Sequence, residues 1–206
     1  MKNDEKNIQT AKEALKTEVL NLNYLVEQLD DLYFSKKFLQ FLHILETCKG
    51  RILVSGVGKS GIIGKKISSV FSSIGFASFF IHPTEAIHGD LGCICKNDIL
   101  LVISCSGETV EVRDIVQYCK KNKIDILSIT CKKKSWLELN SKINLTLKMN
   151  NEAVKDFPIP TTSSLLTLAI CDAITSCLVK NSKLSYKKYG EIHCGGKIGK
   201  TMKNKK

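Results

Sequence analysis

The sequence predicts an α/β fold built on a five-stranded parallel sheet with helices on both faces. Short runs of β-branched and large apolar residues recur along the chain, and helix-length segments with apolar residues at three-to-four spacing separate them. Nearly continuous apolar strands are typical of a parallel sheet that is buried on both faces. The expected strands cover residues 52–55, 77–81, 98–104, 124–130 and 143–147.

Helical patterns also lie before the first expected strand and after the last. Residues 5–47 predict one long or two shorter amphipathic helices. Pro160 and the hydroxyl-rich run 161–164 are start signals for a later helix that extends to about Val179. Because this helix is apolar on nearly all sides, we expect it to be buried, and its length and position favour a contact between subunits.

The chain is long enough to form one domain with a sizeable core, since it has 206 residues and 43% hydrophobic content. We expect a helical segment at residues 1–47 packed on a domain at residues 48–200, followed by a basic tail at 201–206. The polar N-terminus lacks the apolar run of a secretory signal. The apolar segment 163–179 is shorter than a bilayer span requires. We therefore expect a cytoplasmic protein without a membrane helix.

Two features of the composition limit the partners of the chain. The formal net charge is +11, but residues 180–206 alone contain nine lysines and one acid. Because no recognition motif or group of stacking aromatics accompanies these lysines, we expect no nucleic-acid partner. The nine cysteines form an odd set without a CxxC pair, which indicates reduced thiols rather than a disulfide framework or a zinc ribbon.

The turn GVGKSG at residues 56–61 follows the first expected strand and opens a helix. A P-loop would need a glycine five residues before Gly58, where the sequence has Leu53, so we exclude a nucleoside-triphosphate site. The glycines also match a dinucleotide fingerprint, but the first acid after the second strand is Glu85, which is misplaced for a ribose contact. An anion cradle at the helix N-terminus, or a tight turn capped by Ser60, remains.

A second turn, SCSGET at residues 104–109, repeats this arrangement after the third expected strand. Ligands of open α/β sheets bind at the carboxyl ends of the strands, where both turns would lie. Two anion cradles at one edge of the sheet predict a site for a single phosphorylated ligand. The hydroxyl side chains expected to bind it are Ser60, Ser104, Ser106 and Thr109.

Four segments together resemble the SIS (sugar isomerase) domain of arabinose 5-phosphate isomerases. They are SGVGKSG, SxSGET, HPxEAxHGDLG at residues 82–92, and HCGG beginning at His193. The two glycine turns are shared by all SIS domains, whereas the third segment with a late HxGG is more specific. The resemblance extends from about residue 40 to residue 200. It implies a three-layer sandwich, and a homotetramer whose active sites are shared between subunits.

The resemblance also implies an activity, namely the interconversion of D-ribulose 5-phosphate and D-arabinose 5-phosphate for the synthesis of Kdo in lipopolysaccharide. It implies no required cofactor and an inhibitory divalent metal ion, such as zinc, at His82. Longer members continue into a pair of CBS modules, which we expect this chain to lack. The catalytic residues that it implies are Lys59, Glu111, Glu152 and His193, and the further substrate contacts are Gly75, His82 and His88.

Aldose–ketose isomerisation moves a proton between C1 and C2 through an enediol, so it needs a base, groups that move hydroxyl protons, and stabilisation of the developing negative charge. We hypothesise that Glu152 is the C–H base and that Lys59 stabilises the enediolate. His193 would open the sugar ring or shuttle protons between oxygens, and Glu111 would assist proton transfer or orient the sugar. Taken alone, Glu111 is also typical of an acid that complements a helix dipole.

Two other functions stay open at this point. SIS domains also serve regulators as non-catalytic sugar-phosphate sensors, although the leading 47 residues are too short and too uniformly helical for a DNA-binding region. Isomerisation of another phosphosugar, such as a hexulose phosphate, is the second. The family pattern HPGG is HCGG here, so the shape of the loop beside His193 is also open.

Overall fold

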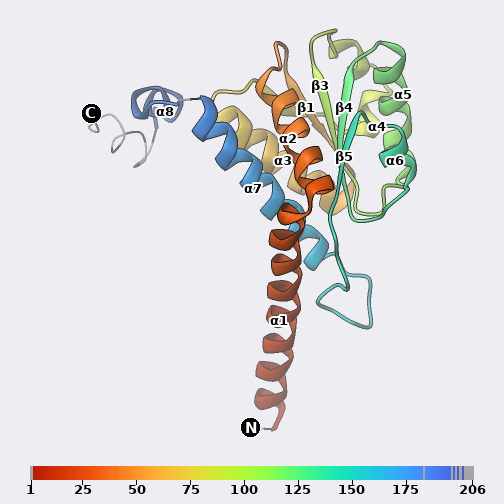
Figure 1. Cartoon of the computed structure of the whole chain (residues 1–206), viewed down its shortest axis with the longest axis vertical. Coiled ribbons are helices and arrows are strands. Elements are labelled where there is room, and N and C mark those ends of the chain that lie inside the picture. Colours follow the sequence, from red (N-terminus) through yellow and green to blue (C-terminus); the bar gives the residue numbers. More distant parts are fainter. Residues whose placement is uncertain (1, 183, 196, 198, 200, 202–206) are drawn as a thin grey trace.

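The computed structural model describes residues 2–182, 184–195, 197, 199 and 201. Its centre is a parallel sheet of five strands in the order β2-β1-β3-β4-β5 (Figure 1). The strands are β1 Ile52–Ser55, β2 Ser78–Phe80, β3 Ile99–Ile103, β4 Asp125–Thr130 and β5 Ile143–Thr146. The predicted α/β fold is therefore confirmed, and each strand lies within the segment expected for it. Of the expected tail, residues 202–206 lie outside the described residues.

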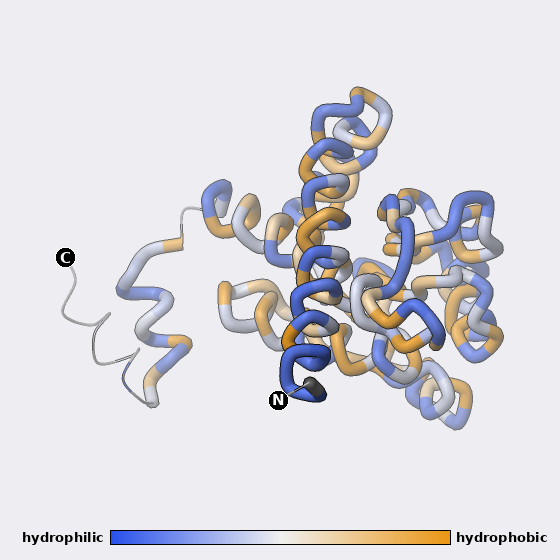
Figure 2. The backbone as a smooth tube through the Cα atoms, turned by 90° about the horizontal axis from the view of Figure 1, so that it is seen from below, coloured by the Kyte–Doolittle hydropathy of each residue, from blue (hydrophilic) through white to orange (hydrophobic). Residues whose placement is uncertain are grey.

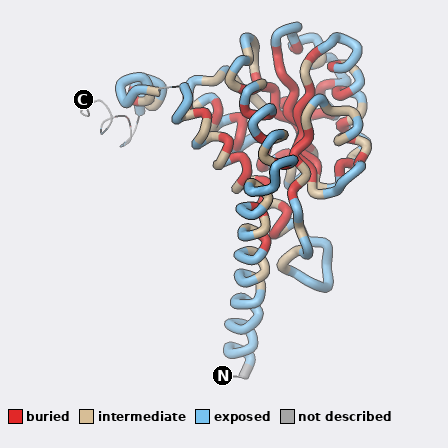
Figure 3. The backbone as a smooth tube through the Cα atoms, viewed as in Figure 1, coloured by how far each residue is buried: buried red, intermediate tan, exposed pale blue. Residues whose placement is uncertain are grey.

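Two helices precede the sheet, α1 at Lys2–Asp30 and α2 at Leu32–Glu46. Asp31 separates them because its carboxylate accepts a hydrogen bond from the backbone N–H of Phe34 at 2.8 Å and so caps α2. Apolar residues at helical spacing bury one face of α2 against the domain. In contrast, most of α1 extends away from the domain and is exposed (Figures 1 and 3).

The remaining helices form layers on both faces of the sheet. They are α3 Gly58–Ser73, α4 Pro83–Ala86, η1 Asp90–Cys93, η2 Val110–Val112, α5 Arg113–Lys121, α6 Trp136–Leu139, α7 Thr162–Ser182 and α8 Tyr186–Ile192. One core cluster joins a face of the sheet to α2, α3 and α7. A second cluster joins the opposite face to α4, α5 and α6. This arrangement is a three-layer sandwich.

The apolar helix expected after Pro160 is α7. By length and composition alone it would be long enough to cross a membrane, and 44% of its most apolar window is buried inside the structure. Leu166, Ile170, Ile174 and Leu178 are fully buried at helical spacing and belong to the core cluster with α2 and α3. Its buried face therefore belongs to the domain core.

Arg51 and Asp98 join the amino ends of β1 and β3. The Asp98 carboxylate accepts hydrogen bonds from the Arg51 backbone N–H at 2.8 Å and from the Arg51 Nε and Nη2 atoms at 3.1 and 2.6 Å. The backbone N–H of Cys95 donates a further bond at 2.7 Å. Burial alone would raise the pKa of Asp98, but the bonds from Arg51 and Cys95 outweigh it and hold the pKa below its ordinary value.

Replacing Asp98 by asparagine is expected to lower the free energy of unfolding at neutral pH by about 1–3 kcal/mol, because buried donors lose a charged acceptor. Since folding lowers the pKa of Asp98, the contribution of its carboxylate is complete above the ordinary aspartate pKa of about 3.9 and is lost as the pH falls through the folded value. Urea unfolding at neutral and acidic pH measures this change.

The matched control is Asp125→Asn, since the carboxylate of Asp125 forms an exposed ion pair with Lys142 at 2.7 Å. Such a pair contributes less than about 1 kcal/mol. The difference between wild type and Asp98→Asn should shrink in acid. An undiminished difference in acid would contradict the assigned role of the carboxylate.

Candidate functional site

A cavity of about 390 Å³ lies at the carboxyl edge of the sheet, beyond the ends of β1 and β3. It is lined by the turn after β1, the turn after β3, the long loop after β5 and the N-terminal end of α7. In the order β2-β1-β3, the chain runs from β1 to β2 on one side of β1 and then crosses to β3 on the other side. This switch point is where open α/β sheets bind their ligands.

The turn after β1 presents the N-terminal end of α3 to the cavity. The helix begins at Gly58, its N-cap is Val57, and no side-chain bond caps it. Ser60 is the third helical residue, so the alternative in which Ser60 only caps the helix is wrong. The N–H groups in the first turn of a helix have no acceptor within it and carry the positive end of its dipole. Lys59 and Ser60, which both line the cavity, therefore flank a group of donors suited to an anion.

Internal hydrogen bonds hold the turn after β3 in shape. The hydroxyl groups of Ser104 and Thr109 bond to each other at 2.8 Å, and the Gly107 N–H donates to the Ser104 hydroxyl at 3.1 Å. The N–H of Glu108 donates to the Ser106 hydroxyl at 3.2 Å. Ser104, Ser106 and Thr109 all line the cavity. Because these bonds form within the turn, the hydroxyl groups are positioned before any ligand arrives.

Gly107 is required by the shape of this turn. Its φ angle is +65°, and an added Cβ atom would lie 2.2 Å from the Ser135 Oγ atom. At Gly58 the φ angle is +59°, but a Cβ atom would meet nothing within 4 Å. A side chain at Gly58 would therefore cause backbone strain alone, whereas a side chain at Gly107 would cause both backbone strain and steric overlap.

Gly107→Ala is expected to destabilise the protein more than Gly58→Ala. Left-handed backbone costs a residue with a Cβ atom about 1–2 kcal/mol, and overpacking adds about 1–3 kcal/mol at Gly107 only. Gly92→Ala is the control, since a Cβ atom there would meet nothing within 4 Å and the φ angle is outside the left-handed region. Chemical denaturation of the three variants tests this ranking, and equal losses at Gly107 and Gly58 would contradict it.

Glu152 brings a carboxylate from the loop after β5 into the same cavity. Its Oε2 atom accepts hydrogen bonds from the Thr161 N–H at 2.9 Å, the Thr161 hydroxyl at 3.1 Å and the Ser163 N–H at 3.1 Å. The carboxylate therefore caps the N-terminal end of α7. All three of these bonds end on Oε2, so this oxygen positions the group and Oε1 can accept a proton.

The hydrogen bonds to Glu152 also set its charge. Burial alone would raise the pKa of Glu152, but the bonds from Ser163 and Thr161 outweigh burial and lower the pKa. Glu152 is therefore ionised at neutral pH, as a base must be. Lys59 lines the same cavity and supplies a positive charge.

Within one chain, the other two expected catalytic residues lie outside this cavity. Glu111 is exposed on the short helix η2. His193 directly follows α8, where its Nδ1 atom lies 2.9 Å from the Tyr189 carbonyl oxygen and its ring stacks on the Tyr189 ring at 4.0 Å. The cavity lies at the N-terminal end of α7, whereas α8 follows the C-terminal end (Figure 1). The 21 residues of α7 span about 30 Å, so one chain does not bring His193 to Glu152.

The expected substrate contacts also divide into two groups. Gly75 follows the C-terminal end of α3, and a Cβ atom there would lie 3.9 Å from the Ile192 side chain, so it belongs with α8. His82 and His88 follow β2, at the sheet edge next to the turn after β1, but neither lines the cavity. His88 is exposed, whereas the buried Nδ1 atom of His82 has no hydrogen-bond partner among the described residues.

The resemblance implied a metal contact at His82. Among the described residues, no group of three or more His, Cys, Asp or Glu side chains is arranged to hold a metal ion. The described residues of one chain therefore do not by themselves form a site for a resident metal ion.

Comparisons with known proteins identify the family of this chain. The family model for the SIS domain matches residues 44–177. This chain belongs to the SIS domain family. It is 38% identical over 95% of its length to an arabinose 5-phosphate isomerase KpsF of Escherichia coli, of which it spans 60%. It is 36% identical to the arabinose 5-phosphate isomerase KdsD of Francisella tularensis, of which it spans 59%.

A solved structure extends this likeness to three dimensions. An Escherichia coli CFT073 protein in complex with arabinose 5-phosphate superimposes on this SIS domain with a TM-score of 0.85 at 32% identity. The match covers 92% of this chain and 98% of that one.

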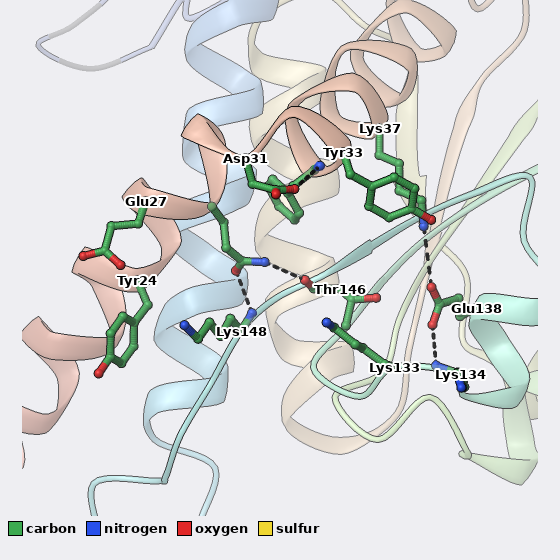
Figure 4. Close-up of a pocket in the computed structure, with 12 residues that line it drawn as sticks. Tyr24, Glu27, Asp31, Tyr33, Lys37, Lys133, Lys134, Glu138, Thr146 and Lys148 are labelled. Carbon is green, nitrogen blue, oxygen red and sulfur yellow. Dashed lines mark hydrogen bonds and ion pairs between the residues drawn. The ribbon is translucent and has the colours of Figure 1, made fainter.

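A larger cavity of about 660 Å³ lies elsewhere on the SIS domain, between α1, α2 and the sheet (Figure 4). Several of its polar groups are bonded to one another. Gln28 donates to the Thr146 carbonyl oxygen at 3.1 Å and accepts from the Lys148 N–H at 2.6 Å. Lys37 pairs with Glu138 at 3.5 Å. These contacts hold the helical segment on the sheet, so we assign this cavity a structural role.

The cavity of the SIS domain at the carboxyl edge of the sheet includes residues that the sequence did not single out. Ser163, Ser164 and Thr167 line it from the first turns of α7, and Cys105 lines it from the turn after β3. In the sequence, the run 161–164 indicated only a helix start. A signal was nevertheless present, because a helix that begins with several hydroxyl groups resembles the two turns already identified.

Proposed function

We propose that this chain is an aldose–ketose isomerase that interconverts D-ribulose 5-phosphate and D-arabinose 5-phosphate through an enediol. The observation that carries the proposal is one cavity that joins two hydroxyl-rich turns to Lys59 and Glu152. Its volume of about 390 Å³ lies in the usual range for small-molecule sites. The names of the related isomerases and the arabinose 5-phosphate complex of the similar structure support the same substrate.

The phosphate group of the sugar would bind between the two turns. The free N–H groups at the start of α3 and the hydroxyl groups of Ser60, Ser104 and Ser106 offer donors without requiring loop movement. This binding would hold the sugar so that its reacting carbons face Glu152 on the opposite wall. Orientation of this kind supplies a large part of enzymatic rate enhancement.

In this proposal, Glu152 moves the proton. In the direction from ketose to aldose, its Oε1 atom removes a proton from C1 and returns it to C2. Negative charge develops on the substrate oxygen in the enediolate, and the Lys59 ammonium group stabilises it. Acid–base groups suffice for this chemistry, so we propose that no cofactor is needed. The expected inhibition by zinc at His82 stays a prediction, which a zinc titration of turnover tests.

We further propose that a second copy of the chain supplies His193. The cavity contains Lys59 and Glu152, and the length of α7 separates His193 from both. In a symmetric oligomer, the α8 end of one subunit would close the cavity of another subunit and so bring His193 to Lys59 and Glu152. Gly75, which lies beside α8, would arrive with His193. Glu111 is exposed outside the cavity of its own chain, and we propose that it approaches the sugar only in the assembled oligomer.

The long helix α1 supports an oligomer. Its apolar positions recur along the helix (Figure 2), and four of them lie on one face with 57% to 64% of each side chain exposed. These four are Ile8, Leu15, Val19 and Val26. A contiguous exposed apolar face of this kind indicates a protein contact. We propose a homotetramer, in the cytoplasm, whose product supplies Kdo for lipopolysaccharide.

Incubation of the purified chain with ribulose 5-phosphate tests the activity. NMR should show arabinose 5-phosphate accumulating to a constant ratio with the substrate, and the same ratio should be reached from arabinose 5-phosphate. Turnover of a hexulose phosphate only would indicate another phosphosugar isomerase. Binding of arabinose 5-phosphate without conversion would indicate a sensor.

A further inference from the structure

Cys105 lies inside the turn that we assign to phosphate binding. It stands between Ser104 and Ser106, and its side chain lines the cavity. It is half-buried, so a small reagent that enters the cavity can reach its sulfur atom. The proposed proton transfer does not use this thiol.

Cys131 faces Cys105 from the neighbouring strand. β3 and β4 pair in parallel as far as Ile103 opposite Ile129, and Cys105 and Cys131 each follow two residues beyond that pair. The Cys131 N–H donates to the Cys105 carbonyl oxygen at 2.8 Å, so the backbones of the two cysteines are in direct contact beyond the strands. Neighbouring strands lie about 4.8 Å apart, within the range of about 4.4–6.8 Å between the Cα atoms of a disulfide.

The surroundings favour the thiolate of Cys105. A hydrogen bond from the Cys131 thiol, together with one from Ser163, outweighs burial and lowers the pKa of Cys105 to about 7. The same interaction and burial raise the pKa of Cys131. Ser163 belongs to the first turn of α7, whose dipole also favours a negative charge. Cys105 is thus the attacking thiol of the pair, and Cys131 is the resolving thiol.

Three other described cysteines do not combine a lowered pKa with a position at the cavity. Burial raises the pKa of Cys119 and of Cys171 to about 12, so both stay protonated at neutral pH. Cys93 is exposed, in η1 near the opposite edge of the sheet, and burial is the main cause that raises its pKa. Cys93 is not among the residues that line the cavity.

We propose that Cys105 and Cys131 form a covalent modification site for small disulfides such as oxidised glutathione, and that their oxidation closes the sugar-phosphate cavity. The Cys105 thiolate attacks one sulfur of oxidised glutathione, which gives a mixed disulfide and releases one glutathione thiolate. Cys131 then loses its proton and attacks the Cys105 sulfur, which forms the protein disulfide and releases the second glutathione. Two electrons pass from the two cysteines to one oxidised glutathione.

Oxidation would block the site because both products change the turn between Ser104 and Ser106. The mixed disulfide fills the cavity, and the protein disulfide draws the turn toward β4. A shift of about 1 Å in a positioned site lowers turnover by on the order of 10²-fold. The modification itself does not depend on the proposed isomerase activity, whereas its effect on turnover rests on that activity.

Peptide mapping of the intact protein tests the modification directly. Trypsin releases Cys105 in the peptide 97–113 and Cys131 in the peptide 124–132, and each peptide contains one cysteine. After treatment of the reduced protein with oxidised glutathione, these two peptides should be joined, and dithiothreitol should separate them. In Cys131→Ser, glutathione should remain on the peptide 97–113. Absence of the joined peptides while other cysteines react would overturn the proposal.

Turnover measured on the same samples tests the effect on the cavity. Oxidised glutathione should lower wild-type turnover by on the order of 10²-fold, and dithiothreitol should restore it. Cys93→Ser is the matched control and should lose turnover as the wild type does, whereas turnover of Cys105→Ser should not change on oxidation. If the two peptides are joined but turnover is unchanged, the proposal that oxidation closes the cavity is wrong. If the chain has no isomerase activity, binding of arabinose 5-phosphate to reduced and oxidised protein replaces turnover.

Discussion

Replacing Glu152 by glutamine is expected to lower turnover of ribulose 5-phosphate by about 10²- to 10⁴-fold, the usual contribution of a positioned general base. Glutamine keeps the size of the side chain and an oxygen that can accept from Thr161 and Ser163. It cannot accept the C1 proton. Steady-state kinetics should therefore show a fall in kcat with a smaller change in KM.

The stability of this variant separates catalysis from helix capping. Glu152 caps α7, and loss of a cap costs about 0.5–2 kcal/mol. If Glu152 only held α7, turnover of the folded variant at low temperature would stay close to that of the wild type. Asp156→Asn is the control, because Asp156 is exposed in the same loop and lies outside the cavity. It should keep wild-type turnover.

The second large effect is expected from combining two inactive variants. His193→Ala and Glu152→Gln should each be nearly inactive alone, because each lacks a group needed at every site. Mixed oligomers formed by unfolding and refolding the two together should regain about a quarter of wild-type activity, since in a symmetric oligomer that fraction of shared sites receives both intact residues. The regained activity should appear in kcat per chain.

The control for this mixing experiment is a chain that carries both substitutions, refolded with His193→Ala. Every site in that mixture lacks His193, so no activity should return. Absence of recovery in the first mixture, with oligomers present by light scattering, would show that His193 does not complete the site of another subunit.

The sheet could be predicted from the sequence because parallel strands buried on both faces have a local signature. Leu100 and Leu101 show it, since adjacent residues of β3 are both fully buried, one in each core cluster. The two turns could also be predicted, because glycine and hydroxyl residues between strand and helix indicate a helix N-terminus. The role of Ser60 could not be predicted, because only the observed start of α3 at Gly58 rules out capping.

The site as a whole could not be derived from the residues alone. Glu152 has little motif around it, and only the fold shows that its carboxylate caps α7 and lines the cavity. The separation of His193 from Glu152 depends on the length and direction of α7, which no local pattern encodes. The pairing of Cys105 with Cys131 depends on the register of β3 and β4. In each case distant segments meet through tertiary packing.

The proposed mechanism requires that Glu152 removes a proton from the sugar in this cavity. Ribulose 5-phosphate incubated in deuterium oxide with wild type or Glu152→Gln tests this claim, with the C1 proton signals followed by NMR. The wild type should exchange one C1 proton for deuterium, and the variant should bind the sugar but exchange at least about 10²-fold more slowly. Exchange by the variant at the wild-type rate would contradict the role of Glu152 as the base.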